Sequence, residues 1–142
     1  MDVVLIMEKL KELDRYLQQL ELHKDVTLKE LAENLDEIWI IERGLHLSIQ
    51  ILLDIGNHIL AGEGIAIEGY SEIFIKLAAI EAIPIEFAEK IKGMAGFRNI
   101  LVHEYASIDL KKLVAALDTG LQDFRNFAGY IVKYIDENRD NV

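Results

Sequence analysis

One short segment of the chain carries most of its chemistry. The run from Phe97 to Tyr105 reads F-R-N-I-L-V-H-E-Y and places Arg98, His103 and Tyr105 in the order R-x4-H-x-Y. Arginine stays charged and presents a fork of N–H donors that matches phosphate oxygens. Histidine titrates close to neutral pH, so it can accept and return a proton. Together these two side chains can hold and cleave a phosphodiester without a metal ion, with the neighbouring 2′-hydroxyl of RNA as nucleophile.

The spacing of this motif also limits how its residues can meet. Five residues along an ideal helix turn about 500°, which leaves Arg98 and His103 roughly 140° apart. We therefore expect them to converge only if the helix ends between them or if a second subunit completes the site. Asn99 and His103 are four residues apart and share a helix face, so Asn99 is a supporting hydrogen-bond donor or acceptor.

The hydrophobic residues repeat with a helical period along nearly the whole chain. We predict an all-α bundle of four to five helices, formed by residues 1–142 as a single domain. Capping signals precede several of the predicted helices: a Thr27–Glu30 capping box, Ser71, Pro84 in a first turn, and Asp109. Gly44 marks a bend or a close helix contact. The predicted helices cover residues 2–22, 28–60, 71–80, 84–103 and 110–135, with 136–142 as a frayed polar tail.

The composition fits a chain with a substantial core and narrows the class of protein. The 142 residues are 51% hydrophobic, contain no cysteine and carry a formal net charge of −10. Without cysteine there are no disulfides or thiolate sites, in agreement with a cytoplasmic location. The N-terminus lacks the basic region of a signal peptide, and no apolar run is long enough to span a membrane. The acidic charge counts against a general nucleic-acid binder, so a local basic cluster would be needed. The candidates for such a cluster are Lys90, Lys92, Arg98, Lys111, Lys112 and Arg125.

Three passages give the chain a resemblance to a known family. They are the long second helix with its segments 40–45 and 53–60, the block Met94–Tyr105, and the overall order and length of the helices. On these residues the chain resembles the HEPN superfamily, in particular its HepT-like branch of small all-helical toxins that are paired with minimal nucleotidyltransferase antitoxins. The match spans essentially the whole chain.

The resemblance implies a fold, an activity and two protein partners. It implies a homodimeric RNA endonuclease of a type VII-like toxin–antitoxin pair, in which the R-x4-H motifs of two protomers face each other with Arg98 and His103 as catalytic residues. It also implies a nucleotidyltransferase antitoxin that attaches AMP to Tyr105. The added bulk and negative charge would expel the substrate phosphate from the cleft. We expect no cofactor.

Other polar and aromatic residues allow more than one interpretation. Asp54 and His58 lie four residues apart on an apolar helix, either beside the site, where they would orient Arg98 or bind a nucleotide, or as a buried pair bonded to the adjoining loop. Trp39 is a core residue, a dimer anchor or an RNA-stacking platform. Tyr105 is a modification site, an RNA contact or a core aromatic.

Simpler readings remain for the motif and for possible metal ligands. His103 can interact with the free carbonyls at a helix end. Glu42 and Arg43 can form an ion pair. His46 with Asp54 and His58 does not form a recognised metal-ligand spacing, so we predict no metal site.

Two other functions compete with the nuclease. The acidic charge favours a non-catalytic nucleotide-binding module, or a substrate-presenting subunit of a nucleotidyltransferase. A purely structural helical dimer is the third possibility.

Overall fold

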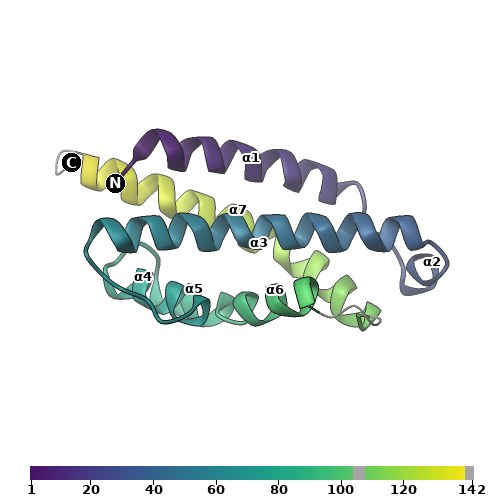
Figure 1. Cartoon of the computed structure of the whole chain (residues 1–142). Coiled ribbons are helices and arrows are strands. Elements are labelled where there is room, and N and C mark those ends of the chain that lie inside the picture. The colour runs from purple at the N-terminus through teal and green to yellow at the C-terminus, as the bar shows by residue number, and fades with distance from the viewer. Residues whose placement is uncertain (104–107, 140–142) are drawn as a thin grey trace.

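The computed structural model describes residues 1–103 and 108–139, and all regular structure within them is helical. The two longest helices, α3 and α7, run side by side through the molecule with α1 on one side, and α4, α5 and α6 lie on the other side (Figure 1). The all-α prediction is confirmed. The elements are α1 (Val3–Glu21), α2 (Leu28–Ala32), α3 (Leu35–Gly62), the 3-10 helix η1 (Tyr70–Glu72), α4 (Ile73–Ala79), α5 (Ile85–Ile91), α6 (Met94–His103) and α7 (Leu110–Asn138).

The helix α1 begins and ends within one residue of the predicted bounds 2–22. The side chain of Asp2 caps it by accepting a hydrogen bond from the Leu5 amide at 3.0 Å. A cap of this kind contributes about 1 kcal/mol. The stripe turns towards α3 and α7, and its buried residues are Ile6, Leu10, Leu13, Leu17 and Leu20.

The predicted helix 28–60 is divided in two, which corrects the sequence interpretation. Half of the Thr27–Glu30 capping box is present: the Thr27 hydroxyl accepts from the Glu30 amide, but the Glu30 carboxylate accepts from that hydroxyl and not from the Thr27 amide. The helix that it starts nevertheless ends at Ala32. Asn34 then caps α3 by accepting from the Glu37 amide at 3.1 Å. Asparagine is among the best N-cap residues, so Asn34 was a helix-start signal that the continuous apolar pattern concealed.

Ser71 does not cap the third predicted helix. It lies within η1, and α4 begins two residues later at Ile73. The predicted helix 84–103 is also divided, because α5 ends at Ile91 and α6 begins at Met94. Gly93 lies in the turn between them. Glycine disfavours a helix interior by about 1 kcal/mol relative to alanine, which makes this position a weak point of a continuous helix.

The last helix begins where the sequence predicts. Asp109 caps α7 by accepting from the Lys111 amide at 3.0 Å. The helix continues to Asn138, so the first three residues of the predicted frayed tail 136–142 are helical. The last three residues of that tail lie outside the described part of the chain.

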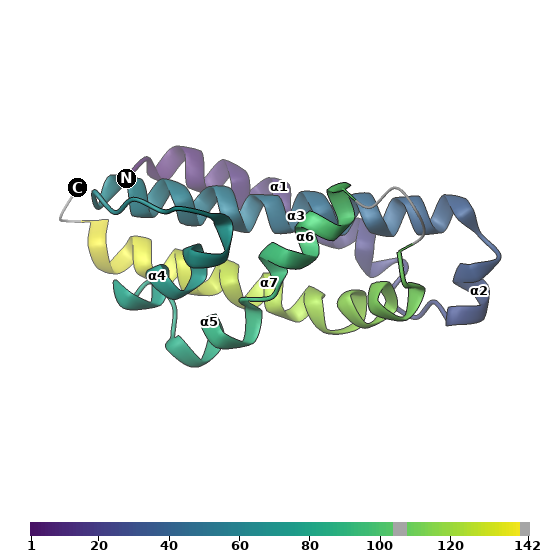
Figure 2. The same cartoon turned by 60° about the horizontal axis from the view of Figure 1, so that its bottom comes forward.

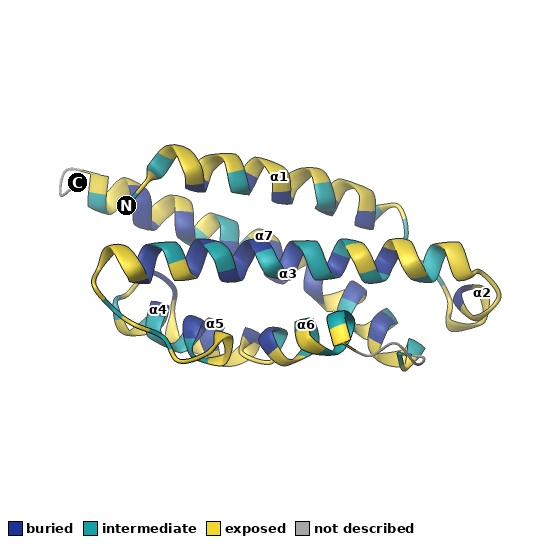
Figure 3. Ribbon diagram, viewed as in Figure 1, coloured by how far each residue is buried: buried dark blue, intermediate teal, exposed yellow. Residues whose placement is uncertain are grey.

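The core is organised around α3, which packs against α1, α2, α4, α6 and α7. Figure 2 shows α6 crossing α3, and Figure 3 shows that the buried residues of α3 lie between its exposed ends. A Cβ added to Gly44 would lie 2.6 Å from Leu20, so the close helix contact predicted there is confirmed. Phe74 of α4 and Phe127 of α7 meet edge to face with ring centroids 6.1 Å apart. Within the described residues, no helix is both long and apolar enough to cross a membrane.

Candidate functional site

Arg98 projects from α6 towards α3, where its guanidinium is held at two points. Its Nε donates to Oε1 of Gln50 at 2.9 Å, and its Nη1 donates to Oδ1 of Asn99 at 3.1 Å. A guanidinium has five N–H donors, so three are not engaged by these two bonds. The side chain is half-buried. Arg98 is therefore oriented by its neighbours while keeping donors free for an anion.

The ring of Tyr70 covers one face of the same guanidinium. The Arg98 Cζ lies 5.4 Å from the centroid of the Tyr70 ring, within the range of a cation–π interaction. Tyr70 belongs to η1, which packs against α6. Three segments that are distant in sequence, η1, α3 and α6, thus fix one arginine.

The hydrogen bond from Arg98 continues along α3 to Asp54. Nε2 of Gln50 donates to Oδ1 of Asp54 at 2.8 Å, and Lys9 of α1 lies 3.7 Å from the other carboxylate oxygen. Asp54 therefore supports Arg98 indirectly, through Gln50. His58 has a different role, because its Nε2 accepts from the Asp2 amide at 3.0 Å and ties the start of α1 to α3. The two residues act separately, so the interpretation as a buried pair is wrong.

His103 is the last residue of α6, and its side chain is exposed. The helix runs without a break from Met94 through Arg98 to His103. This excludes the first of the two expected ways to bring the motif together, because the helix does not end between the two residues. An uninterrupted helix keeps their directions roughly 140° apart within one chain.

Asn99 lies one turn before His103 and is exposed on the same helix. Its carbonyl oxygen is engaged by Arg98, which leaves its amide N–H groups as donors beside the motif. Tyr105, the expected site of AMP attachment, lies outside the described residues.

The local positive charge comes only in part from the residues that the sequence indicates. Three of the candidate cations form ion pairs with acids: Lys90 with Asp123 at 2.9 Å, Lys92 with Glu89 at 2.7 Å, and Arg125 with Glu21 at 3.7 Å. A second cation of the site is Arg43 of α3, because the positive charges of Arg43 and Arg98 both act on His46. The sequence predicted an ion pair of Arg43 with Glu42.

Arg43 bonds to His46 one turn further along α3. The Nη1 of Arg43 lies 3.2 Å from Nδ1 of His46. Arginine only donates, so Nδ1 accepts and the ring hydrogen of the neutral imidazole is on Nε2. Burial lowers the pKa of His46, and the positive charges of Arg43 and Arg98 lower it further. His46 is therefore a neutral donor at neutral pH.

A cleft of about 280 Å³ lies between these residues and α6. We call it the α3–α6 cleft. Burial raises the pKa of the Glu42 carboxyl in its wall. Trp39 is 60% exposed, so its interpretation as a core residue is wrong. The lining residues are Trp39, Glu42, Arg43, His46, Leu101 and Val102.

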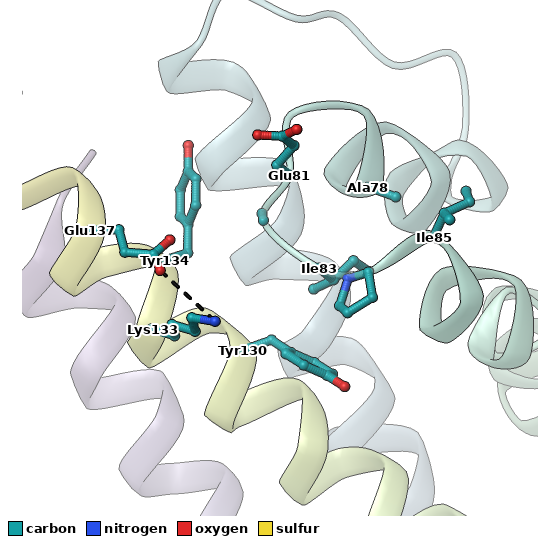
Figure 4. A pocket seen from close by; sticks show the side chains of 10 residues that line it. Ala78, Glu81, Ile83, Ile85, Tyr130, Lys133, Tyr134 and Glu137 are labelled. Carbon is teal, nitrogen blue, oxygen red and sulfur yellow. Dashed lines mark ion pairs between the residues drawn. The ribbon is translucent and has the colours of Figure 1, made fainter.

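A second and larger cleft, of about 450 Å³, lies between the α4–α5 connection and α7. We call it the α5–α7 cleft. Figure 4 shows Lys133 and Glu137 side by side on α7, where they form an ion pair at 3.9 Å. Glu81 lies on the opposite wall, so this cleft holds two carboxylates and one paired lysine. Its charge does not suit a phosphate.

Sequence reasoning missed Gln50, Tyr70 and the pair of Arg43 with His46. One signal was present, because the polar positions of α3 recur every four residues. Side chains four apart on a helix are neighbours, so this row predicts a connected polar stripe on a largely apolar helix. The row is Glu42, His46, Gln50, Asp54 and His58. The contribution of Tyr70 had no such signal, because it depends on how η1 meets α6. In the described part of the chain, no group of three or more His, Asp or Glu side chains could hold a metal ion.

The fold and this site define a helical protein that carries a fixed arginine and an exposed histidine on one helix, and comparison with known proteins identifies the family. The family model described as ribonuclease HepT-like matches residues 6–131. The chain belongs to this family. The resemblance drawn from the R-x4-H-x-Y block and the helix order is thereby confirmed, as is the ribonuclease class that goes with it.

Two curated relatives and two solved structures extend this result. The chain is 31% identical over 141 residues to the tRNA nuclease HepT of Aphanizomenon flos-aquae, covering 95% of each chain. It is 34% identical over 80 residues to the mRNA nuclease HepT of Shewanella oneidensis, covering 56% of this chain and 60% of the relative. Among solved structures, the tri-AMPylated HEPN toxin of Shewanella oneidensis in complex with its MNT antitoxin has a TM-score of 0.81 at 23% identity, covering 94% of this chain and 99% of that one. A cytosolic protein of unknown function from Bacillus subtilis has the same TM-score, 0.81, at 20% identity and covers 96% and 92%.

Proposed function

We propose that this protein is an endoribonuclease toxin that cleaves RNA without a metal ion, at a cleft shared by two protomers. The observation that carries the proposal is the orientation of Arg98, which Gln50 and Asn99 hold by hydrogen bonds and Tyr70 covers. A guanidinium that is fixed before substrate arrives stabilises developing charge without reorganisation. Membership of the ribonuclease HepT-like family, and relatives named as a tRNA nuclease and an mRNA nuclease, support RNA as the substrate.

The proposed reaction needs two proton transfers and one charge stabiliser. The 2′-oxygen attacks the phosphorus as its proton passes to the imidazole of one His103. The P–O5′ bond breaks as the same imidazolium returns its proton to the departing oxygen. The products are a 2′,3′-cyclic phosphate and a 5′-hydroxyl. The free N–H donors of Arg98 bind the phosphorane oxygens, and one such donor supplies about 3–4 kcal/mol in comparable sites.

The proposal includes a homodimer because one chain does not bring its own motif together. The α6 helix continues through both Arg98 and His103, so their side chains diverge. A second protomer would supply the missing group and double the local positive charge, which an acidic chain of net charge −10 needs in order to hold RNA.

The proposal also includes silencing by a nucleotidyltransferase antitoxin that places AMP on Tyr105, with both proteins in the cytoplasm. The support is the likeness in fold to a HEPN toxin that is tri-AMPylated and bound to an MNT antitoxin. An adenylyl group two residues from His103 would add negative charge where the substrate phosphate must bind.

Cleavage of a defined RNA by the purified protein tests the activity. We expect cleavage that persists in EDTA and leaves 2′,3′-cyclic phosphate ends, and we expect it to be lost in Arg98→Ala and in His103→Ala. Arg125→Ala is the matched control, because Arg125 lies on α7 and pairs with Glu21. RNA that stays intact with protein free of AMP would contradict the nuclease. Binding of ATP or of the nucleotidyltransferase in such an inactive protein would support the non-catalytic subunit instead.

Mixing the two inactive variants tests the shared cleft. If one site takes Arg98 from one protomer and His103 from the other, a heterodimer of Arg98→Ala and His103→Ala contains one complete site. We therefore expect the mixture, after exchange of protomers, to regain a substantial part of the wild-type activity. A mixture as inactive as its components, with heterodimers shown by native mass spectrometry, would mean that each chain supplies its own site.

Intact mass after co-expression with the nucleotidyltransferase tests the modification. We expect whole AMP additions on the wild-type protein and none on Tyr105→Phe, which should still cleave RNA. Additions that persist in Tyr105→Phe would place the acceptor at another residue.

A further inference from the structure

We propose that the α3–α6 cleft is a nucleobase subsite, which binds the base of an RNA nucleotide next to the phosphate held by Arg98. The inference rests on the proposed function for the identity of the neighbouring phosphate. Its other support is the geometry of the cleft, whose lining contains neither Arg98 nor His103.

The wall formed by α3 presents an aromatic ring and polar groups on one helix face. Trp39, Glu42, Arg43 and His46 follow the spacing i, i+3, i+4, i+7, which places them along a single side of the helix. The Trp39 side chain is 60% exposed although it is large and apolar. Stacking on an exposed aromatic ring is the contact that every nucleobase can make.

The opposite wall comes from α6 and leads to Arg98. Leu101 and Val102 are three and four residues after Arg98, so the three side chains share the helix face that turns towards α3. Along α3, His46 of the cleft is one turn from Gln50, which holds Arg98. One helical turn is about 5.4 Å, so the cleft and the arginine are close enough for a base and an adjacent phosphate of one RNA strand.

The polar groups of the cleft suit the edge of a base better than a phosphate. His46 accepts from Arg43 through Nδ1, which directs its Nε2–H as a donor. The Glu42 carboxyl in the same cleft can accept from a base N–H, whereas it would repel a phosphate. Burial raises the pKa of Glu42 and, with the charges of Arg43 and Arg98, lowers that of His46, so both groups shift towards neutral forms. A donor and an acceptor beside an aromatic face match a planar heterocycle.

The same polar groups argue against a second copy of the chain as the occupant. A dimer contact that covered Trp39 would also bury the guanidinium of Arg43, whose hydrogen-bond partner is the neutral His46. Burying charges without partners is strongly unfavourable, whereas a bound base leaves one side of the cleft open to water. Contact with a second protomer is therefore an outcome of the test, and the proposal commits to RNA.

Trp39 is the one tryptophan of the chain, which makes its fluorescence a direct probe of the cleft. We expect AMP, GMP, CMP, UMP or a short RNA to quench this emission saturably when added to the full-length His103→Ala protein, in which RNA is not cut. Ribose 5-phosphate, which has sugar and phosphate but no base, should not quench it. Excitation at the red edge of the tryptophan band limits absorption by the nucleotides.

Variants that keep the tryptophan test the polar contacts. We expect Glu42→Gln and His46→Ala to weaken nucleotide binding about fivefold to tenfold, the loss of one hydrogen bond each. Ile40→Ala is the matched control, because Ile40 is 48% exposed beside Trp39 but does not line the cleft. It should bind nucleotides as the parent does.

Trp39→Ala tests the stacking in the active enzyme. We expect its KM for RNA to rise about tenfold with a smaller change in kcat, and Trp39→Phe to recover part of the loss. Because Trp39 is exposed, both variants should keep the thermal midpoint of the parent. A Trp39→Ala enzyme with unchanged KM, or emission that nucleotides do not alter, would overturn the subsite.

Two outcomes distinguish the nucleobase subsite from the nuclease activity and from a dimer contact at Trp39. Saturable quenching in a protein that never cleaves RNA would retain the subsite and reject the nuclease. A blue shift that follows protein concentration, with no response to nucleotides, would reject the subsite and assign Trp39 to an interface between copies of the chain.

Discussion

Two clefts of this molecule, the α5–α7 cleft and the α3–α6 cleft, differ in size and in charge, and the smaller of them lies beside Arg98. The α5–α7 cleft has about 450 Å³ and the α3–α6 cleft about 280 Å³. The larger contains Glu81 and Glu137, and its Lys133 is paired with Glu137. The smaller contains Arg43, whose partner is a neutral histidine, and adjoins Arg98. Arg98, whose hydrogen-bond partners are the neutral side chains of Gln50 and Asn99, identifies the candidate anion site better than the volume of a cleft does.

The two clefts also differ in the backbone conformation of the segments that line them. The α5–α7 cleft includes Glu81, whose φ of 62° lies in the left-handed region. Its amide and that of Ala82 bond to the carbonyls of Ala78 and Leu77, which is a Schellman ending of α4. The unusual φ there serves to end a helix. The conformation of the α3–α6 region is ordinary, and its unusual feature is the hydrogen-bonded row that begins at Arg98.

The sharpest test of this comparison removes one cation from each region. Arg98→Ala should lower the rate of RNA cleavage about 10³-fold, because it deletes the donors aimed at the phosphorane. Lys133→Ala, in the α5–α7 cleft, should leave the rate within about twofold. Single-turnover cleavage of one RNA by both variants is the measurement. A larger loss in Lys133→Ala than in Arg98→Ala would reverse the assignment of the two clefts.

A second test concerns the support of Arg98. Gln50→Leu keeps the size of the side chain but removes the acceptor of the Arg98 Nε–H and the donor to Asp54. We expect kcat to fall about tenfold with a smaller change in KM, because the charge remains but its orientation loosens. Asn57→Ala, an exposed polar position of the same helix, is the control. Equal kinetics in Gln50→Leu and wild type would show that Arg98 needs no support from α3.

Backbone substitutions test whether the conformation of Glu81 is structural. Glu81→Gly should raise the free energy of unfolding by about 1 kcal/mol, because glycine adopts positive φ without the steric cost of a side chain. Gly64, with φ 73° after α3, is the reciprocal position, and Gly64→Ala should lower stability by a similar amount. Urea unfolding measures both. A loss of RNA cleavage in Glu81→Gly would give the α5–α7 cleft a role in function.

At acid pH, the stability of the folded protein should depend on His46 of the α3–α6 cleft. Burial and two arginines lower the pKa of His46, so the unfolded chain binds more protons than the folded one below the ordinary histidine pKa of about 6.5. Stability from this group is present above that pH and is lost as the pH falls through the window. His46→Gln should flatten this part of the profile in urea unfolding between pH of about 7 and about 5. An unchanged slope would remove His46 from the account.

The smallest expected effect is the dependence of stability on Tyr134 of the α5–α7 cleft at alkaline pH. Burial raises the pKa of Tyr134 in the α5–α7 cleft, and the charge and hydrogen bond of Glu63 raise it further. The folded chain therefore holds the phenol proton above pH of about 10, and stability is lost as pH rises from there. Tyr134→Phe should flatten only this limb and leave RNA cleavage unchanged. An effect of Tyr134→Phe on the acid limb would mean that the two regions are coupled.

Helix identity and the catalytic candidates could be predicted from the sequence, whereas two helix breaks could not. The stripe of α1 and the cap at Asp109 are local patterns, and they placed their helices correctly. The division at Asn34 was hidden because apolar residues continue on both sides of it. The division at Gly93 depends on α6 turning to cross α3, which is a tertiary requirement.

The sequence indicated Arg98 and Asp54 as site residues but not the side chain that links them. Arg98 and Asp54 belong to one hydrogen-bonded row, but the link between them is Gln50, a residue with no catalytic signature of its own. Trp39 could be interpreted in three ways until its exposure excluded the core. Tyr70 joins the site only because η1 lies against α6.

The sequence alone determined the helical class and the family, and it supplied the residues proposed to act on a phosphodiester, because periodicity and short motifs are properties of neighbouring positions. Tertiary structure decided how these residues act. The crossing of α6 over α3 is what fixes Arg98 through Gln50, and the unbroken course of α6 is what keeps His103 apart from it within one chain. Such relations depend on the packing of segments far apart in sequence, for which no local pattern encodes the distance or the angle.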